Sequence, residues 1–263
     1  GGDNGYGYNQ MVVFGDSLSD IGTYRVGTVA AVGGGRWTVN LPGAKNWTEL
    51  IAAEYNLPTP CPAQMGLPSV LFTGFVGAPV QNFPDCRNYA QGSSRVTLPY
   101  SPSSLAVQVA VYQGAGGSTV GLPQATAASY PAAAAAAESA AGLGVMAVPV
   151  VTQMNTFLSN VGGSYTGKEL VSVLAGGNDF FMNLNGVSSA AGGGPGAIGA
   201  AQFAGWSSSV QTAVSTGGAP ATVAAANAAV AGMAQAATEL VTDIKTLVLA
   251  KGATHVIVVN LPD

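Results

Sequence analysis

Short runs of consecutive apolar residues alternate along the chain with longer stretches in which apolar residues recur every three or four positions. Three runs have the length and continuity of buried strands: Met11–Phe14, Leu170–Leu174 and His255–Asn260. Near-continuous apolar strands separated by helices are typical of parallel sheets whose two faces are both covered. The pattern therefore predicts an α/β fold built on a parallel sheet.

Three stretches carry apolar residues at helical spacing: Asn46–Tyr55, Val150–Val161 and Thr222–Lys251. In the first, Asn46 can cap the helix, and Glu49 can complete a capping box. Asn46 also begins an Asn-Trp-Thr glycosylation sequon, but capping is the role that we expect. A fourth helix is predicted over Ala132–Ala137, because alanine loses no side-chain entropy in a helix.

Composition narrows the classes of function. Charged residues make up only 8% of the 263 residues, whereas roughly 25% is usual in soluble domains. The 48% of apolar residues is enough for the core of one large domain. Eight Lys and Arg against twelve Asp and Glu give a net charge of −4, which argues against nucleic acid as a partner. Mean hydropathy is +0.34, yet no run reaches the roughly 18 apolar residues of a membrane-spanning helix.

The two cysteines, Cys61 and Cys86, lie in a proline-rich region over about residues 57–100 that reads as an irregular excursion. We favour a disulfide between them; two buried free thiols are the alternative. A disulfide and a low charge together indicate an exported protein, secreted or at the cell surface. The N-terminal sequence has no basic start or apolar stretch, so we expect that any signal peptide has been removed. One histidine and two cysteines are too few for a structural zinc site.

Polar residues follow two of the predicted strands directly. Ser17 comes after the first, in Gly15-Asp16-Ser17, and Asn178 comes after the second, in Gly176-Gly177-Asn178. The carboxyl ends of parallel strands share one edge of a sheet, where open α/β folds bind ligands. A serine and an amide there suit a nucleophile and an oxyanion donor. Ordinary polar turns are the alternative for both segments.

Five segments occur in the order of the conserved blocks of one family and together span residues 14–263: FGDSLSD, GGRW with NWTELIAAEYNLP, NYAQGSS, LAGGNDFF and THVIVVNLPD. In these segments the chain resembles the GDSL family of SGNH hydrolases, and most closely its lipase and esterase branch. The resemblance implies a single domain with a three-layer α/β/α sandwich and a flavodoxin-like parallel sheet. It also implies a serine hydrolase that acts on carboxylic esters.

The resemblance assigns roles to three residues. Ser17 matches the nucleophile, and its backbone N–H would be one oxyanion donor. Gly92 matches a glycine that donates a backbone N–H, and Asn178 matches an asparagine that donates from its side chain. The implied reaction forms an acyl-enzyme on Ser17 from an acyl or aromatic ester, and water then releases the acid. No cofactor and no metal is expected.

The sequence departs from the family pattern at the remaining catalytic pair. The family takes an Asp and a His from a D-x-x-H block, and this sequence contains no such block. His255 begins its predicted strand, so parallel strands would leave it about 16 Å from the edge that carries Ser17, beyond hydrogen-bond reach. We expect a structural role for His255. We also expect the sheet to be incomplete at its C-terminal edge, and the catalytic Asp and His to come from a segment beyond Asp263, as a second polypeptide or C-terminal fragment.

Two regions of low complexity, at about 98–148 and 186–221, read as insertions. They would either form an apolar rim for the substrate or merely extend the surface. Two other functions stay open at this point. One is a phospholipase or acyltransferase of the same family, and the other is a non-catalytic binding or adhesive protein on the same fold.

Overall fold

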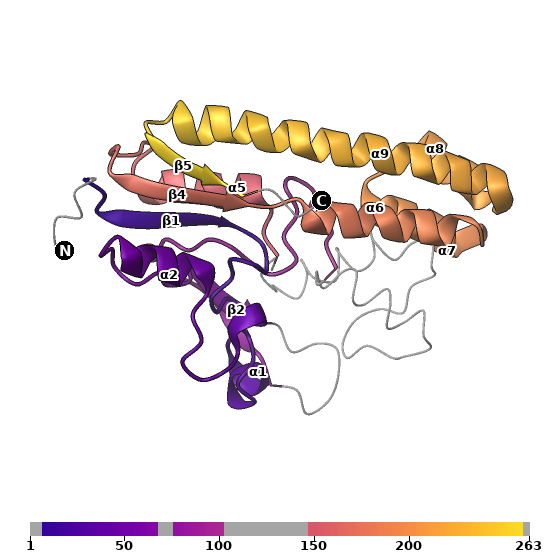
Figure 1. The fold of residues 1–263 in the computed structure, drawn as a ribbon. Helices are drawn as coiled ribbons and strands as arrows, with labels where there is room; N and C mark the ends of the chain where they lie inside the picture. Colours follow the sequence, from indigo (N-terminus) through magenta and orange to yellow (C-terminus); the bar gives the residue numbers. More distant parts are fainter. Residues whose placement is uncertain (1–6, 68–75, 103–146, 260–263) are drawn as a thin grey trace.

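The computed structural model describes residues 7–67, 76–102 and 147–259. Its centre is a parallel three-stranded sheet with the order β1-β4-β5 (Figure 1). The strands are β1 (Gln10–Gly15), β4 (Glu169–Leu174) and β5 (His255–Val258). The predicted α/β fold with a parallel sheet is therefore confirmed. The three predicted strands are found, although the third ends at Val258.

A further stretch of chain, residues 87–91, runs along the other side of β1. Val13 N–H donates to the carbonyl of Arg87 at 2.9 Å, and Tyr89 N–H donates to the carbonyl of Val13 at 2.8 Å. Gln91 N–H donates to the carbonyl of Gly15 at 3.2 Å. This pairing is parallel at Val13 and Asn88. The backbone of β1 is therefore paired on both edges from Val13 to Gly15.

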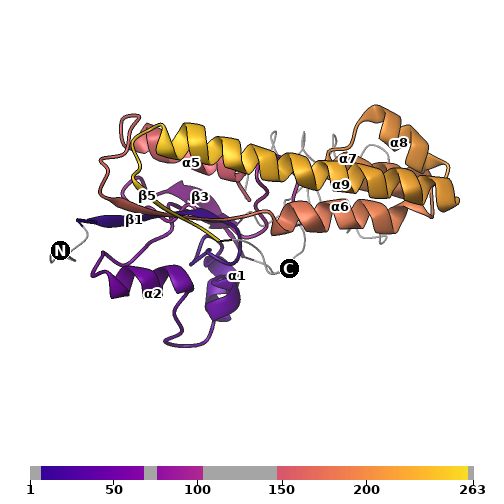
Figure 2. The ribbon, with the colours of Figure 1, turned by 45° about the horizontal axis from the view of Figure 1, so that its top comes forward.

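Helices cover the sheet on both sides, because successive side chains of a strand point to opposite faces. Val12 and Phe14 face α5 (Val150–Asn160) and the π-helical segment Ile244–Leu249. Met11 and Val13 face α2 (Trp47–Glu54). Figure 2 shows α5 and α9 on one side of the strands and α2 on the other.

The predicted helices have clear local causes. Asn46 caps α2: its side chain accepts from Thr48 N–H, and Glu49 completes the capping box, as predicted. The second predicted helix matches α5. The long C-terminal helix, α9 (Gly218–Asp243), begins four residues before the predicted Thr222, because Pro220 is tolerated in a first helical turn. Its last residues continue as the π-helical segment.

The region at 186–221, interpreted above as an insertion, is almost entirely helical. It contains the end of α6 (Gly177–Ala190), all of α7 (Gly194–Ala204) and α8 (Ser208–Ser215), and the start of α9. Alanines and Trp206 bury a second core between these helices. Gly205, at φ 89°, ends α7 in the left-handed conformation that glycine adopts at low cost. The alanine-rich composition therefore builds a helical layer beside the sheet.

The proline-rich region at 57–100 is more regular than predicted. It contains the antiparallel pair β2 (Gln64–Leu67) and β3 (Ala78–Asn82). Before it lie α1 (Gly27–Ala31) and a 3₁₀ turn at Trp37–Val39. The prediction of a disulfide is correct: Cys61 and Cys86 are bonded, with their Cα atoms 5.1 Å apart.

Two predictions fall largely or wholly outside the described residues: the helix over Ala132–Ala137 and the insertion at about 98–148. Among the helices that are described, none has both the length and the apolar character that are needed to cross a bilayer.

We predict that replacing both cysteines by serine lowers the free energy of unfolding by about 3 kcal/mol. The bridge closes a loop across a sequence separation of 25 residues, and opening it gives entropy back to the unfolded chain. Urea denaturation of wild type and C61S/C86S under oxidising conditions measures the difference. Equal midpoints and equal slopes would show that the bridge does not contribute to stability.

Candidate active site

The turn that carries Ser17 follows β1 at its carboxyl end. Residue 15 must be glycine, because a Cβ there would lie 2.5 Å from the carbonyl oxygen of Leu174 on β4. The buried side-chain amide of Gln153, on α5, also binds the backbone of Gly15. It accepts from Gly15 N–H at 3.0 Å and donates to the carbonyl of Gly15 at 2.9 Å. The chain therefore leaves the sheet at a fixed point.

Side chains from two other segments hold the turn itself. The amide of Asn46 donates to the carbonyl of Leu18 at 2.8 Å, and that of Asn88 donates to the carbonyl of Ser19 at 2.9 Å. Asp16 accepts from Leu18 N–H at 3.1 Å. Ser17 is only partly buried, and no hydrogen bond joins its side chain to any described residue. Its hydroxyl thus lies on a turn in which the carbonyls of Asp16, Leu18 and Ser19 accept hydrogen bonds.

Asn178 lies in the first turn of α6, directly after β4. The turn begins at Gly176, whose φ of 113° is left-handed and favours glycine. The Asn178 side chain is 9% exposed, and its Nδ2 donates to the carbonyl of Ser94 at 3.0 Å. The second N–H on Nδ2 has no acceptor among the described residues. Gly15 pairs with Leu174, so the turns that carry Ser17 and Asn178 leave neighbouring strands at the same edge, as predicted.

Gly92 is placed differently from the other two residues. Its N–H donates to Oδ2 of Asp20 at 2.7 Å, and the indole N–H of Trp37 donates to the same oxygen at 3.1 Å. The indole also lies directly against Gly92, because a Cβ at this position would be 2.1 Å from Trp37 Cζ2. In this arrangement the Gly92 N–H is occupied by a carboxylate.

Sequence reasoning missed the buried ion pair between Arg95 and Asp179. The Nε of Arg95 donates to Oδ1 of Asp179 at 2.9 Å, and the two side chains are 1% and 4% exposed. Val96 N–H donates to the other carboxylate oxygen at 3.0 Å. The pair joins the segment after Gly92 to the residue that follows Asn178. The signal in the sequence is the low fraction of charged residues, 8%, which makes each charge a candidate for an ion pair.

Two buried carboxyl groups border the Ser17 turn. The pKa of Asp16 is raised from 3.8 to about 6, mainly by burial. Hydrogen bonds from the backbone N–H groups of Leu18 and Asp16 oppose the rise, and the nearby Asp179 and Asp20 carboxylates add to it. Burial also raises the pKa of Asp20, against the effect of hydrogen bonds from Thr23, Gly22 and Gly92. The edge that carries Ser17 is therefore an environment in which negative charge is costly unless it is hydrogen-bonded.

His255 lies at the opposite edge of the sheet, as predicted. It is the first residue of β5 and pairs with Leu170, near the start of β4. Its Nδ1 is 2.8 Å from Oγ1 of Thr254, and its ring packs edge-on against Tyr8 with the ring centroids 4.9 Å apart. It is the single histidine of the sequence, so no imidazole of this sequence lies beside Ser17.

Comparison with known proteins adds no family to this description. No protein-family model matches the chain, and no curated protein matches it.

We predict that Asp179→Asn lowers the free energy of unfolding by about 3–5 kcal/mol, because it leaves the buried Arg95 guanidinium without its counter-ion. Urea denaturation measures the loss, and Asp85→Asn, at an exposed aspartate, is the matched control. The double variant R95M/D179L is expected to lose less free energy of unfolding than D179N, since it buries no unpaired charge. A D179N variant as stable as D85N would contradict the assignment.

The raised pKa of Asp16 makes stability depend on pH. A buried acid of raised pKa stabilises the fold while it stays protonated, and this contribution is lost as the pH rises from the unfolded value of 3.8 through the folded value of about 6. We predict that the stability of wild type relative to Asp16→Asn falls across this pH window. Chemical denaturation of both proteins at a series of pH values checks it, and a difference that is constant with pH would count against the burial effect.

Proposed function

We propose that the chain is a serine carboxyl-ester hydrolase of the GDSL type, with Ser17 as its nucleophile. The observation that carries the proposal is the shared sheet edge: Ser17 and Asn178 follow two adjacent parallel strands whose last residues pair. A partly exposed hydroxyl and a buried amide with a remaining N–H are the two groups that acyl transfer needs at such an edge. The five sequence segments quoted above support the same assignment.

The proposed reaction has two stages. Ser17 Oγ loses its proton to a base and attacks the ester carbonyl, and the oxyanion accepts hydrogen bonds from Ser17 N–H and Asn178 Nδ2. The C–O bond to the alcohol then breaks, and the alcohol leaves with the proton that the base had taken. Water, deprotonated by the same base, attacks the acyl-enzyme, releases the acid and restores Ser17.

Gly92 contributes to this reaction only if its N–H leaves Asp20. The proposal therefore relies on Ser17 N–H and Asn178 as the oxyanion donors in the observed arrangement. Asp20 is fully buried and also accepts from the N–H groups of Gly22 and Thr23, both at 2.9 Å. These contacts favour an Asp20 carboxylate that stays in place.

The base is proposed to come from a segment beyond residue 263. His255 is at the wrong edge, and it is the single histidine of the sequence. We propose that this segment supplies the catalytic Asp and His and completes a three-layer, flavodoxin-like sandwich. Two features support that architecture: helices on both faces of the sheet, and the spatial order of residues 87–91, β1, β4 and β5.

We also propose that the protein is secreted or displayed outside the cytoplasm. The support is the Cys61–Cys86 disulfide, because such bonds persist in oxidising compartments. The ester substrate is proposed to carry an acyl or aromatic acid. Phospholipase or acyltransferase activity would use the same Ser17 chemistry.

A non-catalytic binding protein is the second candidate, and specific observations favour it. The Gly92 N–H is occupied, and no histidine of this sequence lies beside Ser17. The two candidates differ in the reactivity of Ser17, since a binding protein has no need of an activated hydroxyl.

We predict that a fluorophosphonate labels Ser17 in the protein purified from its natural source, in which any polypeptide that follows residue 263 is present. Peptide mass spectrometry locates the adduct, and Ser17→Ala abolishes both labelling and ester hydrolysis, by at least about a thousandfold. Ser19→Ala is the matched control, because Ser19 Oγ is buried in the same turn without a hydrogen-bond partner among the described residues. A protein that folds but leaves Ser17 unlabelled would support the binding-protein candidate and overturn the hydrolase.

A further inference from the structure

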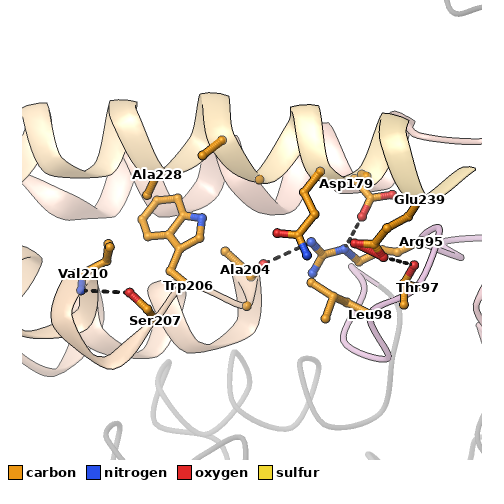
Figure 3. Close-up of a pocket in the computed structure, with 15 residues that line it drawn as sticks. Arg95, Thr97, Leu98, Asp179, Ala204, Trp206, Ser207, Val210, Ala228 and Glu239 are labelled. Carbon is orange, nitrogen blue, oxygen red and sulfur yellow. Dashed lines mark hydrogen bonds and ion pairs between the residues drawn. The ribbon is translucent and has the colours of Figure 1, made fainter.

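A cavity of about 470 Å³ lies between α9 and the connection from α7 to α8 (Figure 3). Neither Ser17 nor Asn178 is among the described residues that line it. One wall is the face of α9 that carries the small residues Ala228, Ala231 and Gly232. These positions lack the bulk to reach the opposite wall, so the space between the helices stays open. Its volume is within the usual range for small-molecule sites.

One end of the cavity is mainly apolar, although Ser207 also lines it. Trp206 and Val210 line this end, beside Ala228 (Figure 3). The indole N–H of Trp206 donates to Oδ1 of Asn183 at 2.8 Å, and the ring lies against Gly186, where a Cβ would be 2.4 Å from it. Trp206 is therefore held in one orientation before any ligand arrives.

The other end is polar and is built around Arg95 (Figure 3). Besides the bond to Asp179, its guanidinium donates to the carbonyls of Tyr100 at 3.1 Å, Phe203 at 3.0 Å and Ala204 at 3.1 Å. These bonds use four of its five N–H groups. The fifth, on Nη2, has no acceptor in the part of the chain that the structure describes. A side chain that is 1% exposed thus lines a cavity with one donor left over.

The charges at this end select the kind of group that fits. Arg95 and Asp179 cancel, and Glu239 is left with one carboxylate oxygen bonded by the Thr97 hydroxyl. An anionic ligand would be repelled by the Glu239 carboxylate, and a cationic group such as an ammonium has no acceptor for the remaining Arg95 N–H. A neutral hydroxyl satisfies both, because it accepts from Arg95 and donates to Glu239. The Gln235 amide, which also lines the cavity, can bond a second hydroxyl.

We propose that this cavity binds a neutral glycoside. The sugar hydroxyls bond Arg95, Glu239 and Gln235, and the apolar aglycone packs on Trp206 and Val210. A ligand with hydroxyl groups at one end and an aromatic group at the other matches the cavity along its length. The inference does not depend on the reactivity of Ser17.

The test is isothermal titration calorimetry of the full-length protein with phenyl β-glucoside, and in parallel with phenyl phosphate. Saturable binding of the glucoside is expected, and phenyl phosphate should bind at least about tenfold more weakly because of Glu239. Glu239→Gln should lower the affinity for the glucoside by about tenfold, since it removes a charged acceptor. Equal affinity for the two probes, or no saturable glucoside binding by a folded protein, would overturn the proposal.

Two alanine variants locate the site. Ala231→Leu places a larger side chain on the cavity wall, and Ala234→Leu makes the same change at an exposed position of α9 that does not line the cavity. Ala231→Leu should abolish glucoside binding, while Ala234→Leu should bind as wild type does. If both variants bind equally well, the glucoside is bound elsewhere and the proposal fails. Circular dichroism of both variants confirms that each has folded.

Discussion

Parallel pairing sets the last residue of β1, Gly15, beside the last residue of β4, Leu174. Because the pairing is parallel, both chains leave the sheet at the same edge, and Ser17 and Asn178 follow within a few residues. The same register puts His255 at the start of β5 and at the other edge. One geometric constraint thus places the nucleophile candidate and the amide at one edge of the sheet and the single histidine at the other.

A second constraint is electrostatic. The buried Arg95 guanidinium is neutralised by Asp179 and bonded by backbone carbonyls at the end of α7. A charge buried in this way is tolerated only when nearly all of its bonds are made. The pair therefore ties the helical layer of α7 to the α6 turn that carries Asn178. It also forms the polar end of the cavity beneath α9, so one side-chain pair joins the two candidate sites.

Local patterns in the sequence predicted the strands, α2 with its Asn46 cap, and α5. They also predicted that Ser17 and Asn178 share one edge of the sheet. Each depends on residues close together in sequence. The Arg95–Asp179 pair spans 84 positions, and no periodicity marks such a contact. The helices α7 and α8 were missed because alanine and glycine give no apolar stripe that separates a packed helix from an insertion. The bond from Gly92 to Asp20 spans 72 positions and was missed for the same reason as the ion pair.

The most direct measurement of whether Ser17 and Asn178 act together is a crystal structure of the protein after reaction with a phosphonate ester, whose P–O group takes the place of the oxyanion. A hydrolase would hold the phosphorus on Ser17 Oγ, with the phosphonyl oxygen within about 3 Å of Ser17 N and Asn178 Nδ2. A phosphonyl oxygen that points away from Asn178, or a phosphonate bound to another residue, would contradict the proposed active site.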